Sequence, residues 1–316
     1  MEWYLILLII LVTLLLLYLV VSLIIAIYVV NYVIHPYCQL KQDAIENAIK
    51  SNRLNLNEYN NLEKEEFLIN SKFNYKLKAT YFKKNTDITF NDNKERVVVI
   101  LHGWTSNRFF MSSVASLYLK LGFHVFAYDQ RNHLESDKMV TTMGNFEADD
   151  LQTVIEVIKE KLGNNIVIGT HGESMGATTC MIHAGRYHSV DFVVEDCGYT
   201  SLKEMLSYNI KYLKKLPLHP TIELANLVFK IKTKSSFDDT DATKYVATCD
   251  EIPMCFIHGD ADRFVPAYMV YKNFDAKNGF KKVYLYQNSK HVASIKDHPE
   301  KYFNDIYEFL KISNIL

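Results

Sequence analysis

A long apolar segment lies near the N-terminus of the chain. From Leu5 to Val30, 26 consecutive residues carry no charge, and nearly all of them are Leu, Ile, Val or Tyr. A helix of about 20 apolar residues crosses the hydrocarbon core of a bilayer, so this segment is long enough to span a membrane with some tilt. We therefore expect residues 1–34 to form an N-terminal transmembrane anchor.

A cleaved signal peptide is the alternative interpretation of this segment. A signal peptide needs a basic first region, a short apolar core and a small-residue cleavage site. Residues 1–4 contain no Lys or Arg, and the apolar run ends in residues 31–36, which read Asn-Tyr-Val-Ile-His-Pro. The pattern favours a retained anchor, and aromatic residues near both ends, such as Trp3 and Tyr28, are typical of interfacial belts.

The charges that follow the apolar segment predict its orientation. Lys41, Lys50 and Arg53 lie after it, and no Lys or Arg lies before it. Positive residues favour the cytoplasmic side, so we expect a single-pass membrane protein with its catalytic domain in the cytoplasm. The five cysteines agree with a reducing compartment, because their number is odd and their spacings match no zinc site.

The hydrophobic pattern changes after a connecting segment, residues 35–62, which is polar with helical periodicity. Residues 64–90 alternate apolar and polar positions, which predicts a pair of half-exposed antiparallel strands. Short, fully apolar runs then follow, as expected for parallel strands that helices cover on both faces. These runs are residues 97–101, 125–128, 166–168, 192–194, 254–257 and 283–286.

Stretches with helical periodicity lie between these runs. The predicted helices are at about residues 108–121, 146–162, 175–187, 200–214, 266–277 and 299–312. Regular alternation of buried strands and helices predicts an α/β fold with a mostly parallel, doubly wound sheet. We assign residues 63–316 to this single domain.

One interval interrupts the alternation. Residues 198–250 separate two predicted core strands and contain no strand pattern of their own, so we expect an inserted helical cap there. Its apolar and aromatic residues suit a substrate with an apolar part, although packing of the cap on the core is the simpler explanation for them. Its lysines suit either anionic lipid headgroups or solvent.

Composition limits the class of partner. The formal net charge is −1 and charged residues make up 22% of the chain, so nucleic-acid binding has no electrostatic support. The histidines show no metal-ligand spacing such as H-E-x-x-H, and we expect neither a metal nor an organic cofactor. Nothing in the sequence indicates an oligomeric state.

The candidate nucleophile follows the third apolar run. Ligands of open α/β sheets bind at the carboxyl ends of the strands. Residues 172–176 read Gly-Glu-Ser-Met-Gly, directly after residues 166–168 and at the start of a predicted helix. In that position G-x-S-x-G is typical of a nucleophile elbow, a turn so sharp that larger flanking residues would clash. Ser174 is therefore the predicted nucleophile.

A serine nucleophile needs a general base, and the base needs a partner that fixes its tautomer. In this fold the acid comes between the serine and the histidine along the chain. Asp262 lies after the run at 254–257, and His291 lies after the run at 283–286. We expect His291 to be the base and Asp262 to orient it. Asp260 is the competing carboxylate, but its place directly after a glycine suits a turn.

Two backbone amides are candidates for stabilising a tetrahedral intermediate. One belongs to Met175, which follows the nucleophile, and the other to Trp104, in the loop after the first buried run. An ordinary strand-to-loop turn is the alternative for His102 and Gly103. The triad candidates elsewhere in the chain favour the oxyanion hole.

Together these motifs resemble the serine α/β-hydrolase superfamily. More narrowly they resemble its membrane-anchored branch of serine aminopeptidase-like, lysophospholipase-like and acyl-protein-thioesterase-like proteins, over about residues 96–298. The resemblance implies an α/β-hydrolase fold with a helical cap. It also implies a triad and an oxyanion hole from the residues already named: Ser174, Asp262 and His291, with Trp104 and Met175.

One loop departs from the pattern of this superfamily. Residues 129–136, Asp-Gln-Arg-Asn-His-Leu-Glu-Ser, are similar to its D-x-R-G-H-G-x-S turn, but Asn132 and Leu134 replace glycines. Asn tolerates a left-handed backbone and Leu tolerates it much less. We therefore expect a changed loop shape and do not carry over the substrate of close relatives.

The sequence supports three functional hypotheses. The favoured one is a membrane-anchored serine hydrolase that cleaves an ester or thioester of a small-molecule or lipid-like acyl substrate through an acyl-enzyme. The second is a serine peptidase or aminopeptidase on the same triad, with an acidic group to hold the substrate amine. The third is a non-catalytic binding protein, although no triad residue is missing. The acidic candidates in the cap are Glu204, Glu223, Asp238, Asp239 and Asp241.

Overall fold

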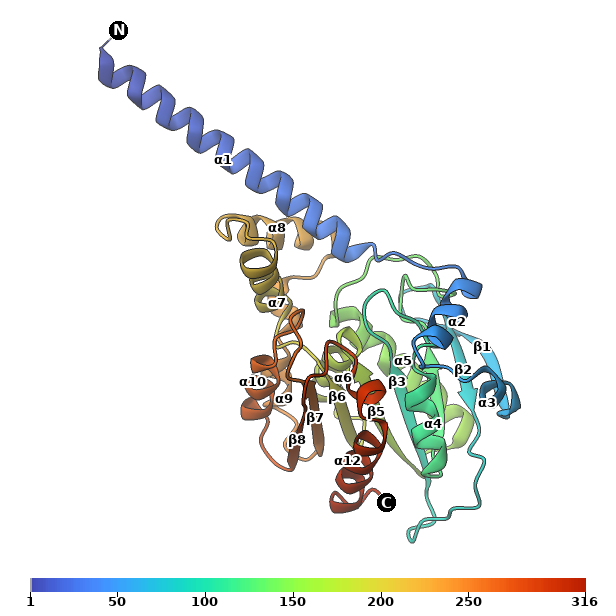
Figure 1. The fold of residues 1–316 in the computed structure, drawn as a ribbon. Helices are drawn as coiled ribbons and strands as arrows, with labels where there is room; N and C mark the ends of the chain where they lie inside the picture. The colour runs from blue at the N-terminus through green and yellow to red at the C-terminus, as the bar shows by residue number, and fades with distance from the viewer. Residues whose placement is uncertain (1) are drawn as a thin grey trace.

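An eight-stranded sheet forms the centre of the structure, a computed structural model that describes residues 2–316 (Figure 1). The strand order is β1-β2-β4-β3-β5-β6-β7-β8, with β2 antiparallel to both its neighbours and all other pairs parallel. The strands are β1 (Lys64–Asn70), β2 (Lys76–Phe82), β3 (Glu95–Leu101), β4 (His124–Tyr128), β5 (Ile166–Glu173), β6 (Phe192–Asp196), β7 (Met254–Gly259) and β8 (Lys281–Tyr286). The predicted α/β fold is confirmed.

Helices cover both faces of the sheet, and the alternation of side chains along β3 shows why its sequence is apolar throughout. Val97 and Val99 face a core that includes α5 (Asn145–Leu162) and α6 (Met175–Tyr187). Val98 and Ile100 face a second core that includes α4 (Ser112–Lys120) and α12 (Pro299–Ile312). Successive residues of a strand point to opposite faces, so a strand covered on both sides needs apolar residues at every position.

The interval between β6 and β7 contributes less to the cap than its sequence suggests. Helix α7 (Leu202–Tyr208), the π-helical turn η1 (Asn209–Leu213) and α8 (Thr221–Thr233) lie above the sheet. After the 3₁₀ turn η2 (Phe237–Thr240), however, α9 (Ala242–Val246) packs with α6 in the core below. The cap expected over residues 198–250 therefore ends before α9, because Ala242 and Val246 are buried in the sheet's own core.

The remaining helices lie in the connecting segment and in the C-terminal part of the domain. Helices α2 (Lys41–Lys50) and α3 (Leu56–Asn61) lie in the connecting segment, α10 (Tyr268–Ala276) follows β7, and α11 (Ser294–Asp297) follows β8. Helix α2 is amphipathic, and its Ala44 and Ala48 are buried. Two small residues at i and i+4 lie on one helix face, which lets this helix pack closely on the domain.

The N-terminal helix α1 (Trp3–Ile34) is long and apolar enough to cross a membrane. Every side chain from Trp3 to Val21 is exposed, and the first buried one is Ser22. From there on, Ala26, Val30 and Val33 repeat at helical spacing and face α8 of the cap. The helix therefore has an exposed half and a half that packs on the domain (Figure 1).

The last turn of α1 is bonded to loops of the hydrolase domain. The Trp104 indole donates to the Val33 carbonyl at 3.0 Å. The Ile34 carbonyl accepts from the Thr141 amide at 3.1 Å and from the Asn132 side chain at 3.2 Å. Carbonyls at a helix C-terminus lack partners within the helix, so these donors satisfy groups that would otherwise need water or a cap.

Candidate active site

The turn between β5 and α6 has the geometry of a nucleophile elbow. Ser174 has φ 54° and ψ −115°, and its amide donates to the Asp196 carbonyl at 2.8 Å. A Cβ on Gly172 would lie 2.2 Å from the Gly176 carbonyl carbon, and one on Gly176 would lie 2.3 Å from the Leu101 carbonyl oxygen. Both neighbours are backbone atoms, so neither glycine can carry a side chain while the turn persists.

Three predicted site residues form one hydrogen-bonded chain. His291 Nε2 lies 2.9 Å from Ser174 Oγ, and His291 Nδ1 lies 2.6 Å from Asp262 Oδ2. A histidine that donates from Nδ1 to a carboxylate presents Nε2 as the acceptor for the serine hydroxyl. The structure therefore brings together the nucleophile, base and acid that the sequence singled out, from the ends of β5, β7 and β8.

The environment of Asp262 keeps it ionised. Its Oδ1 accepts from the amides of Phe264 at 2.8 Å and Val265 at 3.0 Å, and His258 Nε2 lies 3.4 Å from its Oδ2. Burial alone would raise the pKa of this carboxyl, but hydrogen bonds from His258 and His291 hold that pKa well below its ordinary value. Asp260 is occupied elsewhere, because its Oδ1 accepts from the Asn288 amide at 2.6 Å.

The candidate oxyanion hole is oriented by a neutral histidine. His102 Nε2 accepts from the Gln130 amide at 2.9 Å, so its Nδ1 carries the proton and donates to the Gly103 carbonyl at 2.7 Å. Burial lowers the pKa of His102 well below its ordinary value, which keeps the ring neutral. The C=O and N–H of a trans peptide point in opposite directions, so this bond turns the Trp104 amide away from His102.

Both candidate oxyanion donors are free. Within residues 2–316, neither the Trp104 amide nor the Met175 amide donates to another protein group. Met175 begins α6, where the first amides of a helix have no intrahelical acceptor and carry partial positive charge. The two amides can therefore serve an oxygen that develops negative charge.

The loop with the two departures has left-handed backbone at both positions. Asn132 has φ 63° and Leu134 has φ 38°, a conformation that Leu disfavours much more than Asn. The Asn132 side chain donates to α1, and the Asn132 carbonyl accepts from the Cys38 thiol at 2.7 Å. A glycine would lack the side-chain bond, which explains an asparagine where the loop meets α1.

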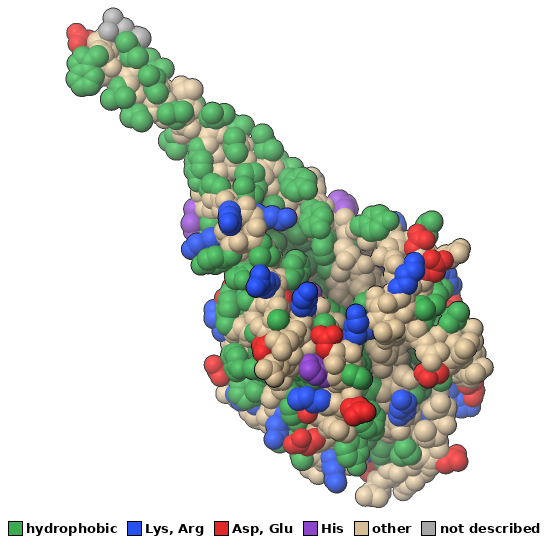
Figure 2. Space-filling view, in the orientation of Figure 1, with side chains coloured by type: hydrophobic (Ala, Val, Ile, Leu, Met, Phe, Trp, Pro, Cys, Tyr) green, Lys and Arg blue, Asp and Glu red, His purple; other side chains and the backbone are tan. Residues whose placement is uncertain are grey.

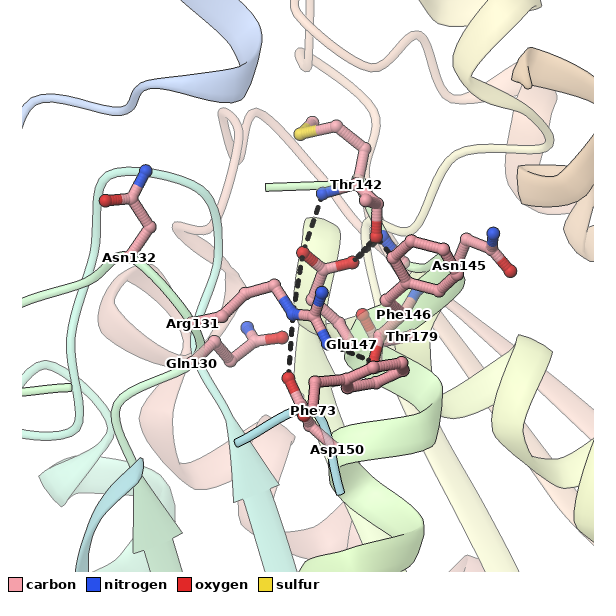
Figure 3. Close-up of polar contacts among 12 residues, drawn as sticks. Phe73, Gln130, Arg131, Asn132, Thr142, Asn145, Phe146, Glu147, Asp150 and Thr179 are labelled. Atoms are coloured by element: carbon pink, nitrogen blue, oxygen red, sulfur yellow. Dashed lines mark hydrogen bonds and ion pairs between the residues drawn. The ribbon is translucent and has the colours of Figure 1, made fainter. Parts of the chain in front are cut away.

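Arg131, which belongs to this loop, ties it to α5 (Figure 3). Its guanidinium is buried and lies 2.8 Å from Asp150 Oδ2 and 3.8 Å from Glu147 Oε1, both on α5. Glu147 in turn accepts from Thr142 and from the Gly144 amide at 2.9 Å. Two carboxylates from one helix therefore fix the loop that carries Asn132.

A buried ion pair behind the elbow was not predicted. Arg53 was expected to be a juxtamembrane cation, but it is 2% exposed and pairs with Glu173, the residue before Ser174. It also donates to the Phe110 carbonyl at 3.1 Å and to the Val292 carbonyl, next to His291, at 3.5 Å. Arg53 therefore joins the connecting segment to the elbow and to the histidine loop, and it adds nothing to the charge facing a membrane.

Replacing Arg53 by Met should strongly destabilise the protein. The change leaves the Glu173 carboxyl buried without a cation, and breaking a buried pair costs about 3–5 kcal/mol. For a domain of this size we expect the melting temperature of the detergent-solubilised protein to fall by about 6–20 °C. The matched control is Lys50→Met, which breaks the exposed pair with Glu46 and should change it by less than about 4 °C.

The destabilisation by Arg53→Met should grow with pH. Burial raises the pKa of Glu173 above its ordinary value, and the Arg53 guanidinium opposes that rise. Without Arg53 the folded carboxyl holds its proton to higher pH than the unfolded one, so stability falls as pH increases. This account would be contradicted if Arg53→Met lowered the melting temperature equally at pH 5 and pH 8. It would also be contradicted if the double variant Glu173→Gln, Arg53→Met were no more stable than Arg53→Met alone.

A pocket of about 400 Å³ opens in front of the triad. The connecting segment forms one wall through Ala44 and Asn47, and Trp104 and Phe264 form others. A larger hollow of about 860 Å³ lies between α3, α4 and α12, but no residue of the triad lines it. The smaller pocket is therefore the candidate substrate site.

Comparisons with known proteins agree with this architecture. The family model described as alpha/beta hydrolase fold matches residues 96–207. An uncharacterized protein, YqkD of Bacillus subtilis (strain 168), is 30% identical over 260 residues, which cover 81% of this chain and 82% of that protein. The chain belongs to the α/β-hydrolase fold family.

Solved structures of esterases share the fold. The esterase Pf2001 of Pyrococcus furiosus superposes with a TM-score of 0.67 at 22% identity, over 89% of this chain and 97% of its own. Est1E of Butyrivibrio proteoclasticus, solved with ferulic acid bound, has a TM-score of 0.62 at 16% identity, over 79% and 100% of the two chains. At these identities the likeness concerns the fold.

Proposed function

We propose that this protein is a membrane-anchored serine hydrolase that cleaves an ester or thioester of an apolar acyl substrate. The observation that carries the proposal is the continuous chain from Ser174 Oγ through His291 to Asp262, with distances of 2.9 and 2.6 Å. A serine hydroxyl is a weak nucleophile until a positioned base accepts its proton. A structural serine has no need of a histidine whose tautomer is fixed in this way.

The proposed reaction has two steps. Ser174 Oγ attacks the acyl carbonyl while His291 Nε2 takes its proton, and the amides of Trp104 and Met175 stabilise the negative oxygen. The leaving group departs with the proton from His291, and the acyl group stays on Ser174. Water, activated by His291, then releases the acid and restores the hydroxyl. Removal of one oxyanion donor typically costs about 10²–10³ in rate.

The surroundings of the site support an acyl ester over a peptide. An aminopeptidase needs an acidic group to bind the substrate amine, and none of the five acidic cap candidates lines the pocket in the described part of the chain. Glu204, for example, lies 2.6 Å from Lys272. The acidic residue that does line the pocket, Glu173, is paired with Arg53.

We propose that α1 remains attached and spans the membrane. Its exposed half, Trp3–Val21, is apolar, and its other half supplies Ala26, Val30, Val33 and Ile34 to the cluster that contains Met175. Cleavage of α1 as a signal peptide would expose that cluster to water. The exposed Lys41 and Lys50, which follow α1 along the chain, favour the cytoplasmic side for the domain.

Acyl-ester profiling tests the proposed substrate class. We expect the detergent-solubilised protein to hydrolyse p-nitrophenyl acyl esters and to prefer medium or long acyl chains, because an apolar pocket stabilises each added methylene. Aminoacyl p-nitroanilides, run beside them, should be hydrolysed at least about 100-fold more slowly. Faster hydrolysis of the anilides would overturn the ester assignment in favour of a peptidase.

A further inference from the structure

The position of the cap along α1 has a consequence for membrane binding. About 20 residues of helix cross the hydrocarbon core, so a span that begins at Trp3 ends near Ser22. The Tyr18 hydroxyl donates to the carbonyl of His219, in the loop before α8. Tyr18 lies inside that span, about one helical turn before its end. The loop beside Tyr18 therefore lies at the membrane interface or deeper in the bilayer.

The part of the cap at this level exposes apolar side chains. Residues 211–217, Lys-Tyr-Leu-Lys-Lys-Leu-Pro, are all exposed. On α8, Leu227 and Ile231 are 55% and 64% exposed at i and i+4, on one face of the helix. We call residues 211–217 together with this face of α8 the cap surface. In water it would be an unfavourable apolar patch beside an apolar helix.

The segment that contains the cap surface is strongly basic. Residues 209–234 contain six lysines and one glutamate, a formal charge of +5 in a chain whose net charge is −1. Figure 2 shows blue side chains grouped where the cap meets the apolar α1. The lysines are Lys211, Lys214, Lys215, Lys230, Lys232 and Lys234.

Apolar residues interleaved with lysines are typical of segments that lie in a membrane interface. The apolar side chains enter the boundary between headgroups and acyl chains, and the lysine stems extend toward the charged headgroups. Each lysine near an anionic surface adds attraction that salt can screen. A water-exposed solvated face would explain the lysines but not Leu213, Leu227 and Ile231 beside them.

We propose that the cap surface inserts into the anionic headgroup region of the membrane that α1 spans. The inference rests on the proposed span of α1 and adds a second contact, which fixes the tilt of the domain. The partner is an anionic lipid surface. The apolar cluster of α1, α7 and α8 then lies between that surface and Met175, so the site is held close to the lipid.

Lipid quenching in the full-length protein tests this proposal. A nitrobenzoxadiazole fluorophore is attached to single cysteines in a Cys38→Ser background, because the other four native cysteines are buried. The protein is placed in nanodiscs of phosphatidylcholine and phosphatidylglycerol with brominated acyl chains. Leu11→Cys reports on the anchor, Leu227→Cys on the cap surface, and Ile312→Cys, 40% exposed at the end of α12, is the distant control.

We expect strong quenching at residues 11 and 227 and none at residue 312. Quenching at 11 without quenching at 227 overturns cap insertion and leaves the anchor intact. Absence of quenching at 11 overturns the anchor itself. If the fluorophore at residue 227 is shielded from water but not quenched by lipid, a protein partner or a second copy covers the cap surface. This result also overturns the proposal.

Charge reversal separates anionic lipid from general apolar insertion. Changing Lys211, Lys214 and Lys215 to Glu should reduce quenching at residue 227 about twofold or more in anionic nanodiscs. The matched control changes Lys94, Lys120 and Lys311, all exposed and near the opposite edge of the sheet, and should leave quenching unchanged. Equal effects of the two triple variants, or equal quenching in pure phosphatidylcholine, would contradict recognition of anionic headgroups.

Discussion

Replacing Ser174 by Ala should lower kcat for ester hydrolysis by about 10⁶ and abolish labelling by a fluorophosphonate probe. In the proposed mechanism the oxygen of this hydroxyl forms the acyl-enzyme, and removing the nucleophile from a serine triad has an effect of this size. A residual rate of about 10³–10⁴ over water can persist, because the oxyanion donors and the pocket remain. The loss should be kinetic, since a small alanine fits at this buried position.

The measurement pairs activity with the site of labelling. Wild-type protein should carry the probe on the peptide that contains Ser174, and the Ser174→Ala protein should carry none. Ser313→Ala, at the end of α12, is the matched serine control and should label normally. Labelling that survives Ser174→Ala would show that another residue is the nucleophile and would overturn the proposed mechanism.

Replacing Asp262 by Asn should lower kcat by about 10⁴ without loss of the fold. The carboxylate holds His291 with its proton on Nδ1, and an amide at this position favours the tautomer that cannot accept the serine proton. Because the pKa of Asp262 is held well below its ordinary value, the carboxylate is ionised at every pH used for the assay. Moderately acidic pH should therefore leave Asp262 ionised, so it should not reproduce the effect of Asp262→Asn.

Asp260→Asn is the matched control for Asp262→Asn. Asp260 accepts from the Asn288 amide and lies outside the chain of hydrogen bonds to Ser174. We expect its substitution to change kcat by less than about threefold, since an Asn side chain keeps an acceptor oxygen. If Asp260→Asn lowered kcat more than Asp262→Asn, Asp260 would be the acid of the triad in place of Asp262.

The fold and the order of the site residues could be predicted from the sequence because both depend on local patterns. Short, fully apolar runs such as residues 97–101 are typical of strands covered on both faces. The chain order serine, acid, histidine, each directly after a strand, then places Ser174, Asp262 and His291 at one edge of the sheet. The structure brings these three together, and their catalytic roles stay predictions.

The contacts that hold the site together could not be predicted in the same way. Arg53 and Glu173 are 120 positions apart, and no periodicity in either segment marks them as partners. The role of His258 at the Asp262 carboxylate depends on how the loop after β7 folds back on its own strand. Local patterns specify helices and strands, whereas such pairs depend on how those elements pack.

The substitutions in the loop at residues 129–136 show a further limit. Residue type alone disfavours a left-handed backbone, above all at Leu134, yet Asn132 and Leu134 both have positive φ. The surroundings hold the conformation, since Arg131 is fixed by Asp150 and Glu147. Tertiary contacts can thus maintain a backbone that the residue type alone disfavours.

The bonds between the last turn of α1 and the domain have a consequence for any form of the protein without its anchor. The carbonyls of Val33 and Ile34 hold Trp104 and Asn132, so the loop with the candidate oxyanion donor rests on α1. A protein that lacks residues 1–34 would lose these supports. One whose α1 is exchanged for an unrelated apolar helix would keep backbone carbonyls but lose the face of Ala26, Val30 and Val33 that positions them. Such a protein could be soluble or membrane-attached and still have a displaced loop at Trp104.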